Sequence, residues 1–160
     1  MIGKVTLSPL TPDLAEPLRN VRVAEDQVVF SGQPFEVIDN PEHDLDIHAI
    51  LLNGQVVGMF RIDNSYHRTY PFARPETPGL RTFLIDQTMQ GRGIATACCK
   101  QLRSYLSDHY TQATAVFLTV NLRNPAARKV YLAGGFVDTG DEWPHGEAGP
   151  QNILKLDLSA

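Results

Sequence analysis

The chain has 160 residues, of which 42% are hydrophobic, so it can form a single domain over residues 1–160 with a full core. Its 18 acidic and 14 basic side chains give a net charge of −4, which argues against a nucleic-acid partner. No apolar run approaches the roughly 20 residues that span a bilayer, and the N-terminus does not resemble a signal peptide. Cys98 and Cys99 are neighbours, so we expect no disulfide between them, as in a cytoplasmic protein.

Apolar or alternating runs predict seven strands. These runs cover residues 4–7, 47–52, 56–62, 80–85, 115–120, 136–138 and 154–158. The second and third runs flank Asn53-Gly54, and Asn-Gly between apolar runs predicts a β-hairpin. Gly58 inside the third run predicts a β-bulge.

Four segments are predicted to be helical: residues 12–20, 21–30, 94–108 and 125–133. Thr11 and Asn124 each precede a proline and are typical of helix caps, and Gly134-Gly135 is typical of a helix end. Polar or proline-rich stretches predict loops over residues 34–46, 63–78 and 139–151. This order of elements predicts an α/β protein with a mixed sheet covered by helices.

A buried strand, a loop with two glycines and an amphipathic helix follow one another between residues 80 and 105. The first N–H groups of a helix lack intrahelical partners and the helix dipole favours negative charge, so this arrangement is typical of an anion site. Gly91 and Gly93 let the backbone approach a ligand, and Gln90 and Arg92 add polar reach. The loop matches neither the nucleotide P-loop nor the dinucleotide fingerprint. A tight turn without a ligand is the alternative.

Residues 90–95, Gln-Gly-Arg-Gly-Ile-Ala, match the pattern Gln/Arg-x-x-Gly-x-Gly/Ala, and here the sequence resembles the GNAT superfamily of N-acetyltransferases. A second family segment, Asn-x-x-Ala-x-x-x-Tyr-x-x-x-Gly-Phe, is matched at family spacing by residues 124–136. The resemblance implies a mixed, mostly antiparallel sheet of about seven strands flanked by helices. It also implies an acetyl-CoA-dependent N-acetyltransferase that acts on a primary amine.

The resemblance further implies roles for individual residues. Tyr131 would be the general acid that protonates the leaving thiolate, although a packed helix aromatic is the alternative. Asn124 would contact the cofactor, as well as cap a helix, and Arg92 is either a phosphate ligand or a solvated cation. Together, the residues expected to hold acetyl-CoA (coenzyme A) are Phe83, Leu84, Ile85, Gln90, Gly91, Arg92, Gly93, Ile94, Ala95, Thr96 and Asn124.

The general base stays open, because Gly79, Arg81 and Thr82 stand where some family members carry a carboxylate. The candidates are Glu25, Asp26, Asp63, Asp86 and a water chain. The two cysteines are not expected to be nucleophiles, since neither has an evident base. The five histidines show no metal-ligand spacing, so no metal is predicted.

The chemical class of the acceptor is predicted from the distribution of charged residues along the chain. No Lys or Arg lies between Val23 and Phe60, whereas seven of the 18 acids do. Residues 83–86, 90–91 and 25–30 also resemble the spermine/spermidine acetyltransferase branch, which predicts a small, polyamine-like acceptor near Glu25 and Asp26. An acidic loop that only keeps the protein soluble is the alternative.

Two other functions remain open: a non-catalytic acyl-CoA sensor, and acetylation of a protein N-terminus or lysine. Neither a membrane nor a nucleic acid is an expected partner, and a homodimer is left open.

Overall fold

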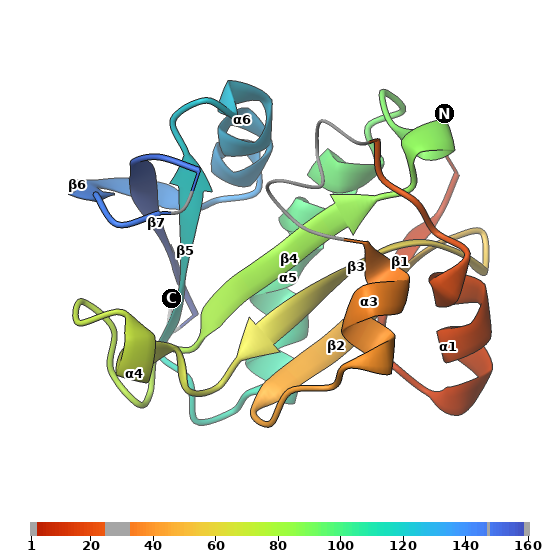
Figure 1. Cartoon of the computed structure of the whole chain (residues 1–160), viewed down its shortest axis with the longest axis horizontal. Coiled ribbons are helices and arrows are strands. Elements are labelled where there is room, and N and C mark those ends of the chain that lie inside the picture. The colour runs from red at the N-terminus through yellow and green to blue at the C-terminus, as the bar shows by residue number, and fades with distance from the viewer. Residues whose placement is uncertain (1–2, 25–32, 147, 159–160) are drawn as a thin grey trace. The chain divides into compact units, whose positions relative to one another are not determined.

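The computed structural model describes residues 3–24, 33–146 and 148–158. The chain forms two compact units, drawn in Figure 1. The first unit comprises Met1–Asp63 and Leu80–Cys98, and the second comprises Asn64–Gly79 and Cys99–Ala160. The predicted cofactor residues 83–96 therefore belong to the first unit, and Asn124 and Tyr131 belong to the second.

Four strands of the first unit lie side by side in the order β1-β2-β3-β4. Their bounds are Val5–Pro9, Leu45–Leu52, Gln55–Asp63 and Gly79–Ile85, of which Gly79 itself belongs to the second unit. β1 pairs with β2, and β2 with β3, in antiparallel register. In the described part of this unit, the helices are α1 (Pro12–Arg19), α3 (Pro34–Asp39) and the first turn of α5 (Ile94–His109).

The β2–β3 hairpin confirms the prediction from Asn53-Gly54. Both residues have positive φ, at 50° and 83°, and this left-handed pair matches the twist of the strands in a two-residue turn. The register between the strands shifts beside Gly58, so the predicted bulge is also confirmed. A Cβ on Gly58 would lie 2.3 Å from the Leu84 carbonyl oxygen, so close strand approach also requires glycine here.

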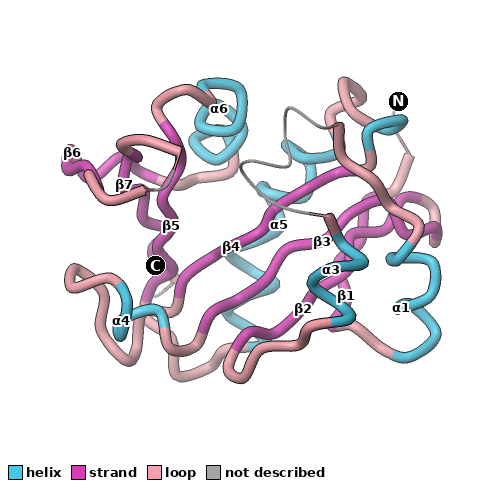
Figure 2. Tube along the Cα trace, in the orientation of Figure 1, coloured by secondary structure: helices cyan, strands magenta, loops and turns pink. Residues whose placement is uncertain are grey.

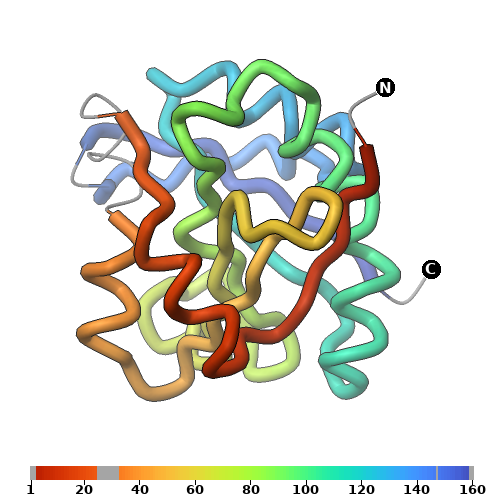
Figure 3. Tube along the Cα trace, turned by 90° about the vertical axis from the view of Figure 1, so that its right-hand side faces the viewer, coloured from red at the N-terminus to blue at the C-terminus, as the bar shows by residue number. Residues whose placement is uncertain are grey.

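The core of the first unit lies between this sheet and the helices α1 and α3, which lie side by side (Figure 3). Its buried members are Leu18, Val21, Val23, Val56, Met59 and Leu84. Fully burying one such side chain contributes roughly 1.5–3 kcal/mol. The helix α1 begins at Pro12 as predicted, although the Thr11 hydroxyl donates to the Asp13 carboxylate instead of capping a backbone N–H.

Two predictions for the segment after α1 are wrong. Residues 21–24 are not helical, because Val21 and Val23 both turn inward and the Gln33 amide bonds to the N–H and carbonyl of Val23. The rest of the predicted helix, residues 25–30, lies outside the described residues. The predicted loop over residues 34–46 contains α3 and the start of β2 (Figure 2), since Pro34 occupies the first turn of α3 and Val37 and Ile38 pack on the core.

The second unit contains β5 (Ala115–Asn121), β7 (Gln151–Asp157) and β6 (Val137–Trp143), paired antiparallel in that order. Gly79, the first residue of β4, pairs in parallel with Phe117 of β5. The seven strands therefore form the mixed, mostly antiparallel arrangement that the sequence predicts. The helices of this unit are α4 (Tyr66–Thr69), the rest of α5, and α6 (Pro125–Ala133).

The strand β6 is longer than the predicted residues 136–138, and the predicted loop over 139–151 is wrong at its start. A register shift between Asp138 and Glu142 accommodates Gly140, whose φ is +87°. The Thr139 hydroxyl donates to the Ile153 carbonyl within the irregularity, and pairing with β7 resumes at Glu142, opposite Asn152. The predicted loop over 63–78 includes the short helix α4, and Tyr66 of this helix packs where a Cβ on Gly79 would clash at 2.0 Å.

Candidate functional site

The predicted cofactor residues of the first unit form the end of β4, a loop and the start of α5. Phe83, Leu84 and Ile85 end the strand, and Asp86 then caps a short 3-10 turn, η1 (Gln87–Met89). The segment 90–93 is exposed, and α5 begins at Ile94. These predicted cofactor residues therefore lie together in the first unit, and Asn124 belongs to the second.

The loop has the backbone conformation that its glycines allow. The φ angles of Gly91 and Gly93 are +77° and +82°, in the left-handed region that side chains disfavour. A Cβ on Gly91 would meet nothing within 4 Å, so conformation and not crowding explains glycine there. The Gln90 side-chain amide donates to the Ile85 carbonyl at 2.9 Å and closes the loop onto β4.

Within the described residues, the first four N–H groups at the start of α5 have no hydrogen-bond acceptor. Ala97 is the first residue to bond back into the turn, from its N–H to the Gly93 carbonyl at 3.0 Å. Among the hydrogen bonds of the described residues, none is donated by the backbone N–H groups of residues 93–96. These groups, the helix dipole and the exposed Arg92 side chain fit a diphosphate. The coenzyme A pyrophosphate therefore fits the residues present.

Immediately before the cofactor residues, β4 contains an irregularity that the sequence did not reveal. Thr82 has φ +55° within the strand. Arg61 of β3 donates to the Thr82 hydroxyl from Nε at 2.9 Å and from a terminal nitrogen at 2.7 Å. Burial lowers the pKa of the Arg61 guanidinium, and the nearby Glu42 carboxylate only partly offsets this effect. In the sequence, the one sign of this irregularity is Arg61, a charged residue inside the apolar run of residues 56–62.

The carboxylates proposed as general base are engaged in other interactions. The Asp63 side chain, 8% exposed, accepts a hydrogen bond from Arg81 at 3.1 Å. Asp86 accepts from the Thr88 N–H and hydroxyl and from the Arg22 N–H. Partial burial raises the pKa of Asp86, but these hydrogen bonds outweigh it and hold the pKa below its usual value. Glu25 and Asp26 lie outside the described residues.

In the second unit, Asn124 caps α6 as predicted. Its side-chain oxygen accepts from the Ala127 N–H at 3.3 Å, and Pro125 follows in the first turn. Tyr131 lies near the end of the same helix, half-buried, with its ring 5.7 Å from the ring of Phe136. The structure thus confirms the capping role of Asn124 and gives Tyr131 a packing partner, while both cofactor-related roles stay predictions.

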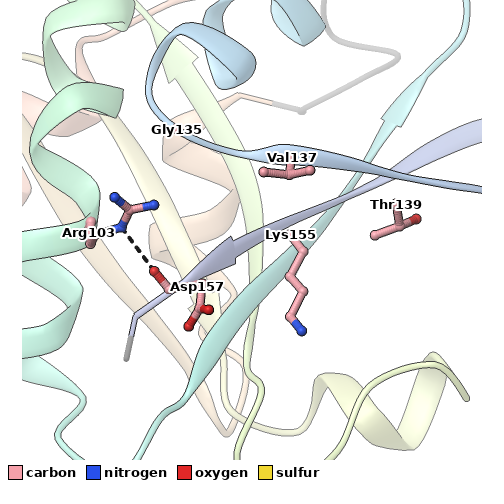
Figure 4. A pocket seen from close by; sticks show the side chains of 6 residues that line it. All are labelled: Arg103, Gly135, Val137, Thr139, Lys155 and Asp157. Carbon is pink, nitrogen blue, oxygen red and sulfur yellow. Dashed lines mark hydrogen bonds between the residues drawn. The ribbon is translucent and has the colours of Figure 1, made fainter. Parts of the chain in front are cut away.

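The second unit also contains a pocket of about 330 Å³ (Figure 4). Its lining residues are Arg103, Gly135, Val137, Thr139, Lys155 and Asp157. Arg103 donates from Nε to the Asp157 backbone carbonyl at 3.0 Å across one side of it. None of the predicted site residues lines this pocket, so it plays no part in the candidate site.

The two cysteines are poorly suited to be nucleophiles. Cys98 and Cys99 are buried, and burial raises the pKa of Cys99 to about 12, so this thiol is not ionised at neutral pH. Within the described ranges, no group of three or more His, Cys, Asp or Glu side chains is placed to hold a metal ion. No helix in the described part of the chain has the length and apolarity to cross a membrane.

Two arginines that lie outside the acidic segment in sequence neutralise part of the negative charge that predicted a cationic acceptor. Arg19, in α1, pairs with Asp39 at the end of α3. Glu42 lies 3.8 Å from Arg61. Both arginines flank the span without Lys or Arg, so folding returns positive charge to a region that looks purely acidic in sequence.

Comparison with known proteins gives a family and several structural neighbours. The acetyltransferase (GNAT) family matches residues 15–136. No curated protein matches the chain. Among solved structures, aminoglycoside acetyltransferase AAC(6')-Ib with coenzyme A has a TM-score of 0.74 at 18% identity, covering 96% of this chain and 95% of that one.

Two further structures are similar in fold. A chimera of spermidine N-acetyltransferase SpeG from Vibrio cholerae and hSSAT has a TM-score of 0.67 at 17% identity, covering 97% and 96% of the two chains. An uncharacterised protein of Bacillus halodurans has a TM-score of 0.74 at 12% identity, covering 96% and 83%. At these identities the likeness concerns the fold.

Proposed function

The chain belongs to the acetyltransferase (GNAT) family and is an acetyl-CoA-dependent N-acetyltransferase, and from this premise we propose that it acetylates a primary amine of a small molecule. The observation that carries the proposal is the loop before α5, where two left-handed glycines and four available N–H groups fit a pyrophosphate. The family match spans parts of both units, which supports one acetyltransferase domain over residues 1–160.

Acetyl-CoA binding is assigned to three groups of residues. The N–H groups of residues 93–96 and the Arg92 side chain bind the pyrophosphate, and Gln90, Gly91 and Gly93 shape the loop. The backbone of Phe83, Leu84 and Ile85 pairs with the pantetheine arm. Asn124 contacts the cofactor beside its capping role. When bound, acetyl-CoA supplies the thioester whose acetyl group is transferred.

Tyr131 is proposed as the general acid that protonates the departing thiolate. A phenol donates a proton or a hydrogen bond to the sulfur, and its loss would slow the step by on the order of 10²–10⁴-fold. Water is the proposed route for the proton that leaves the amine, because Asp63 is ion-paired and Asp86 has a lowered pKa. A neutral amine is required for attack on the thioester, so turnover rises with pH as the acceptor loses its proton.

The acceptor class is proposed from chemistry shared by two groups of neighbours. Aminoglycosides and spermidine, named with AAC(6')-Ib and SpeG, are both small molecules with several amines. The acids of residues 36–46 would attract such polycations, although Arg19 and Arg61 neutralise part of this charge. Glu25 and Asp26 are retained as candidate contacts for a polyamine-like acceptor.

An amine panel tests the proposed function. Thiol release from acetyl-CoA is measured with spermidine, kanamycin, a monoamine, free lysine and a peptide with a free N-terminus. We expect a small polyamine to give the highest kcat/KM, and this advantage to shrink as salt shortens the Debye length from about 10 Å at 0.1 M. A peptide that exceeds every small amine would instead identify a protein acetyltransferase.

A non-catalytic sensor of acyl-CoA is the competing function. Such a module would bind acetyl-CoA without accelerated thiol release for any amine. Calorimetric binding of acetyl-CoA together with a silent panel would therefore replace the proposed enzyme by a sensor.

A further inference from the structure

The left-handed residue in β4 is a threonine, which is the kind of residue least suited to that conformation. Thr82 has φ +55°, and a β-branched side chain at positive φ is a genuine outlier. Conformations of this kind persist only where the surrounding structure holds them, and they cluster at functional sites. The left-handed conformation of Thr82 therefore needs support from neighbouring side chains.

Arg61 holds it. Two nitrogens of the guanidinium donate to the single Thr82 hydroxyl, at 2.9 and 2.7 Å, across the 21 residues that separate the two side chains in sequence. The Arg61 side chain is only 12% exposed, and its other terminal nitrogen lies 3.8 Å from Glu42. A planar guanidinium with several donors in a fixed geometry is well suited to fixing one hydroxyl in place.

An ion pair also joins the two strands beside this contact. Arg81, which precedes Thr82, donates to Asp63 at 3.1 Å, and Asp63 lies two residues beyond Arg61 on β3. Two side-chain contacts, Arg61 with Thr82 and Arg81 with Asp63, thus join β4 to β3 where β4 turns left-handed. The segment that follows directly is Phe83, Leu84 and Ile85.

We propose that Arg61 is a positioning residue for the cofactor: through the Thr82 hydroxyl it fixes the left-handed turn that aims the backbone of residues 83–85 at the pantetheine arm. The proposal rests on the acetyltransferase function proposed above. Burying an arginine in a strand costs more than burying an apolar residue, and its partners here only compensate that cost. The gain lies in the conformation of β4, which an apolar residue at position 61 would leave without support.

The test compares two ligands that share the pyrophosphate. Coenzyme A and its 3′-phospho-ADP fragment share the adenosine, the 3′-phosphate and the pyrophosphate, and only coenzyme A carries the pantetheine arm. Calorimetry of Arg61→Met and Thr82→Val should show a coenzyme A Kd weakened by about tenfold, the factor expected for a hydrogen bond to a charged group, and an unchanged Kd for the fragment. Thr82→Ser keeps the hydroxyl and should match the unmodified protein.

A rescue variant separates positioning from general stability. Glycine takes φ > 0 without a side-chain partner, so Arg61→Met combined with Thr82→Gly should recover most of the lost coenzyme A affinity. Equal weakening of coenzyme A and fragment, or no weakening in either single variant, would overturn the proposal. If Arg61→Met does not fold, the Thr82→Val and Thr82→Ser pair decides the question alone. An unmodified protein that does not bind coenzyme A would instead overturn the proposed function.

Discussion

Phe136 contacts Tyr131 in two ways, through a backbone hydrogen bond and through its aromatic ring. The Phe136 N–H donates to the Tyr131 carbonyl at 3.1 Å, and the two rings meet edge to face at 5.7 Å and 62°. Gly135, with φ +109°, bonds to the Leu132 carbonyl in the same turn. This is the Schellman ending of a helix, with the apolar contact that accompanies it. The ring and backbone of Tyr131 therefore take part in the helix ending, and the hydroxyl is the group proposed to donate a proton.

That separation makes Tyr131→Phe a clean substitution. The ring and the helix ending are retained, so turnover should fall much more than the binding of acetyl-CoA weakens. Turnover should fall by on the order of 10²–10⁴-fold if the phenol protonates the thiolate. Single-turnover kinetics measure this directly. Tyr131→Leu, which also loses the ring contact, is the control that should lower the melting temperature as well.

Gly93→Asp should abolish the thermal stabilisation that acetyl-CoA gives. A ligand that binds only the native protein raises its stability by mass action, and a carboxylate at the start of α5 would repel the pyrophosphate. Gly54→Asp is the matched control, because Gly54 also has positive φ, at +83°, but lies in the β2–β3 turn. A folded Gly93→Asp protein with the full thermal shift would refute the loop assignment.

Asp86→Asn should destabilise the protein at neutral pH and not at acid pH. The pKa of Asp86 is lowered in the folded protein, so its ionised form stabilises the fold above the unfolded value of about 3.9. This contribution is lost as pH falls through the folded pKa. The Asn amide cannot accept from both Arg22 and Thr88 as the carboxylate does. Denaturant unfolding of both proteins from about pH 7 to about pH 2 measures the difference, which should vanish at the acid end.

Gly134→Ala should destabilise the fold by roughly 1–3 kcal/mol through overpacking. A Cβ at this position would lie 2.5 Å from the Cys99 Cβ and 2.8 Å from the backbone of the same residue, and φ is an ordinary −83°. Urea unfolding measures the loss. Gly140→Ala is the contrasting variant, because its Cβ would meet nothing within 4 Å and only its φ of +87° is unfavourable. Equal stability of Gly134→Ala and the unmodified protein would show that α6 shifts away from α5 at no cost.

Local sequence signals predicted the elements whose structure is decided locally. Asn53-Gly54 predicted a two-residue turn because both residues favour positive φ, and Asn124-Pro125 predicted a helix start because cap and first turn lie within four residues. The glycines of the cofactor loop belong to the same group. The expected strands 4–7, 80–85 and 115–120 each lie within one or two residues of those observed.

The missed features depend on contacts between distant residues. The helix α3 has only six residues, and it is stabilised by packing Val37 and Ile38 on a core built from α1 and β3. The left-handed conformation of Thr82 could not be predicted, because no local signal favours it and Arg61 lies 21 residues away. Likewise, Asp39 and Glu42 pair with Arg19 and Arg61, which lie outside the span of residues 23–60 that contains no Lys or Arg.

The division of the chain into units has a consequence for its synthesis. Each unit is assembled from two separated segments, and the boundaries fall at residues 63/64, 79/80 and 98/99. Two of these boundaries lie inside β4 and α5, so no linker separates the units. On the ribosome, the first unit stays incomplete until Cys98 has emerged, by which time part of the second has been made. Each unit is therefore encoded by two separated stretches of sequence, and neither can be cut out as one continuous fragment.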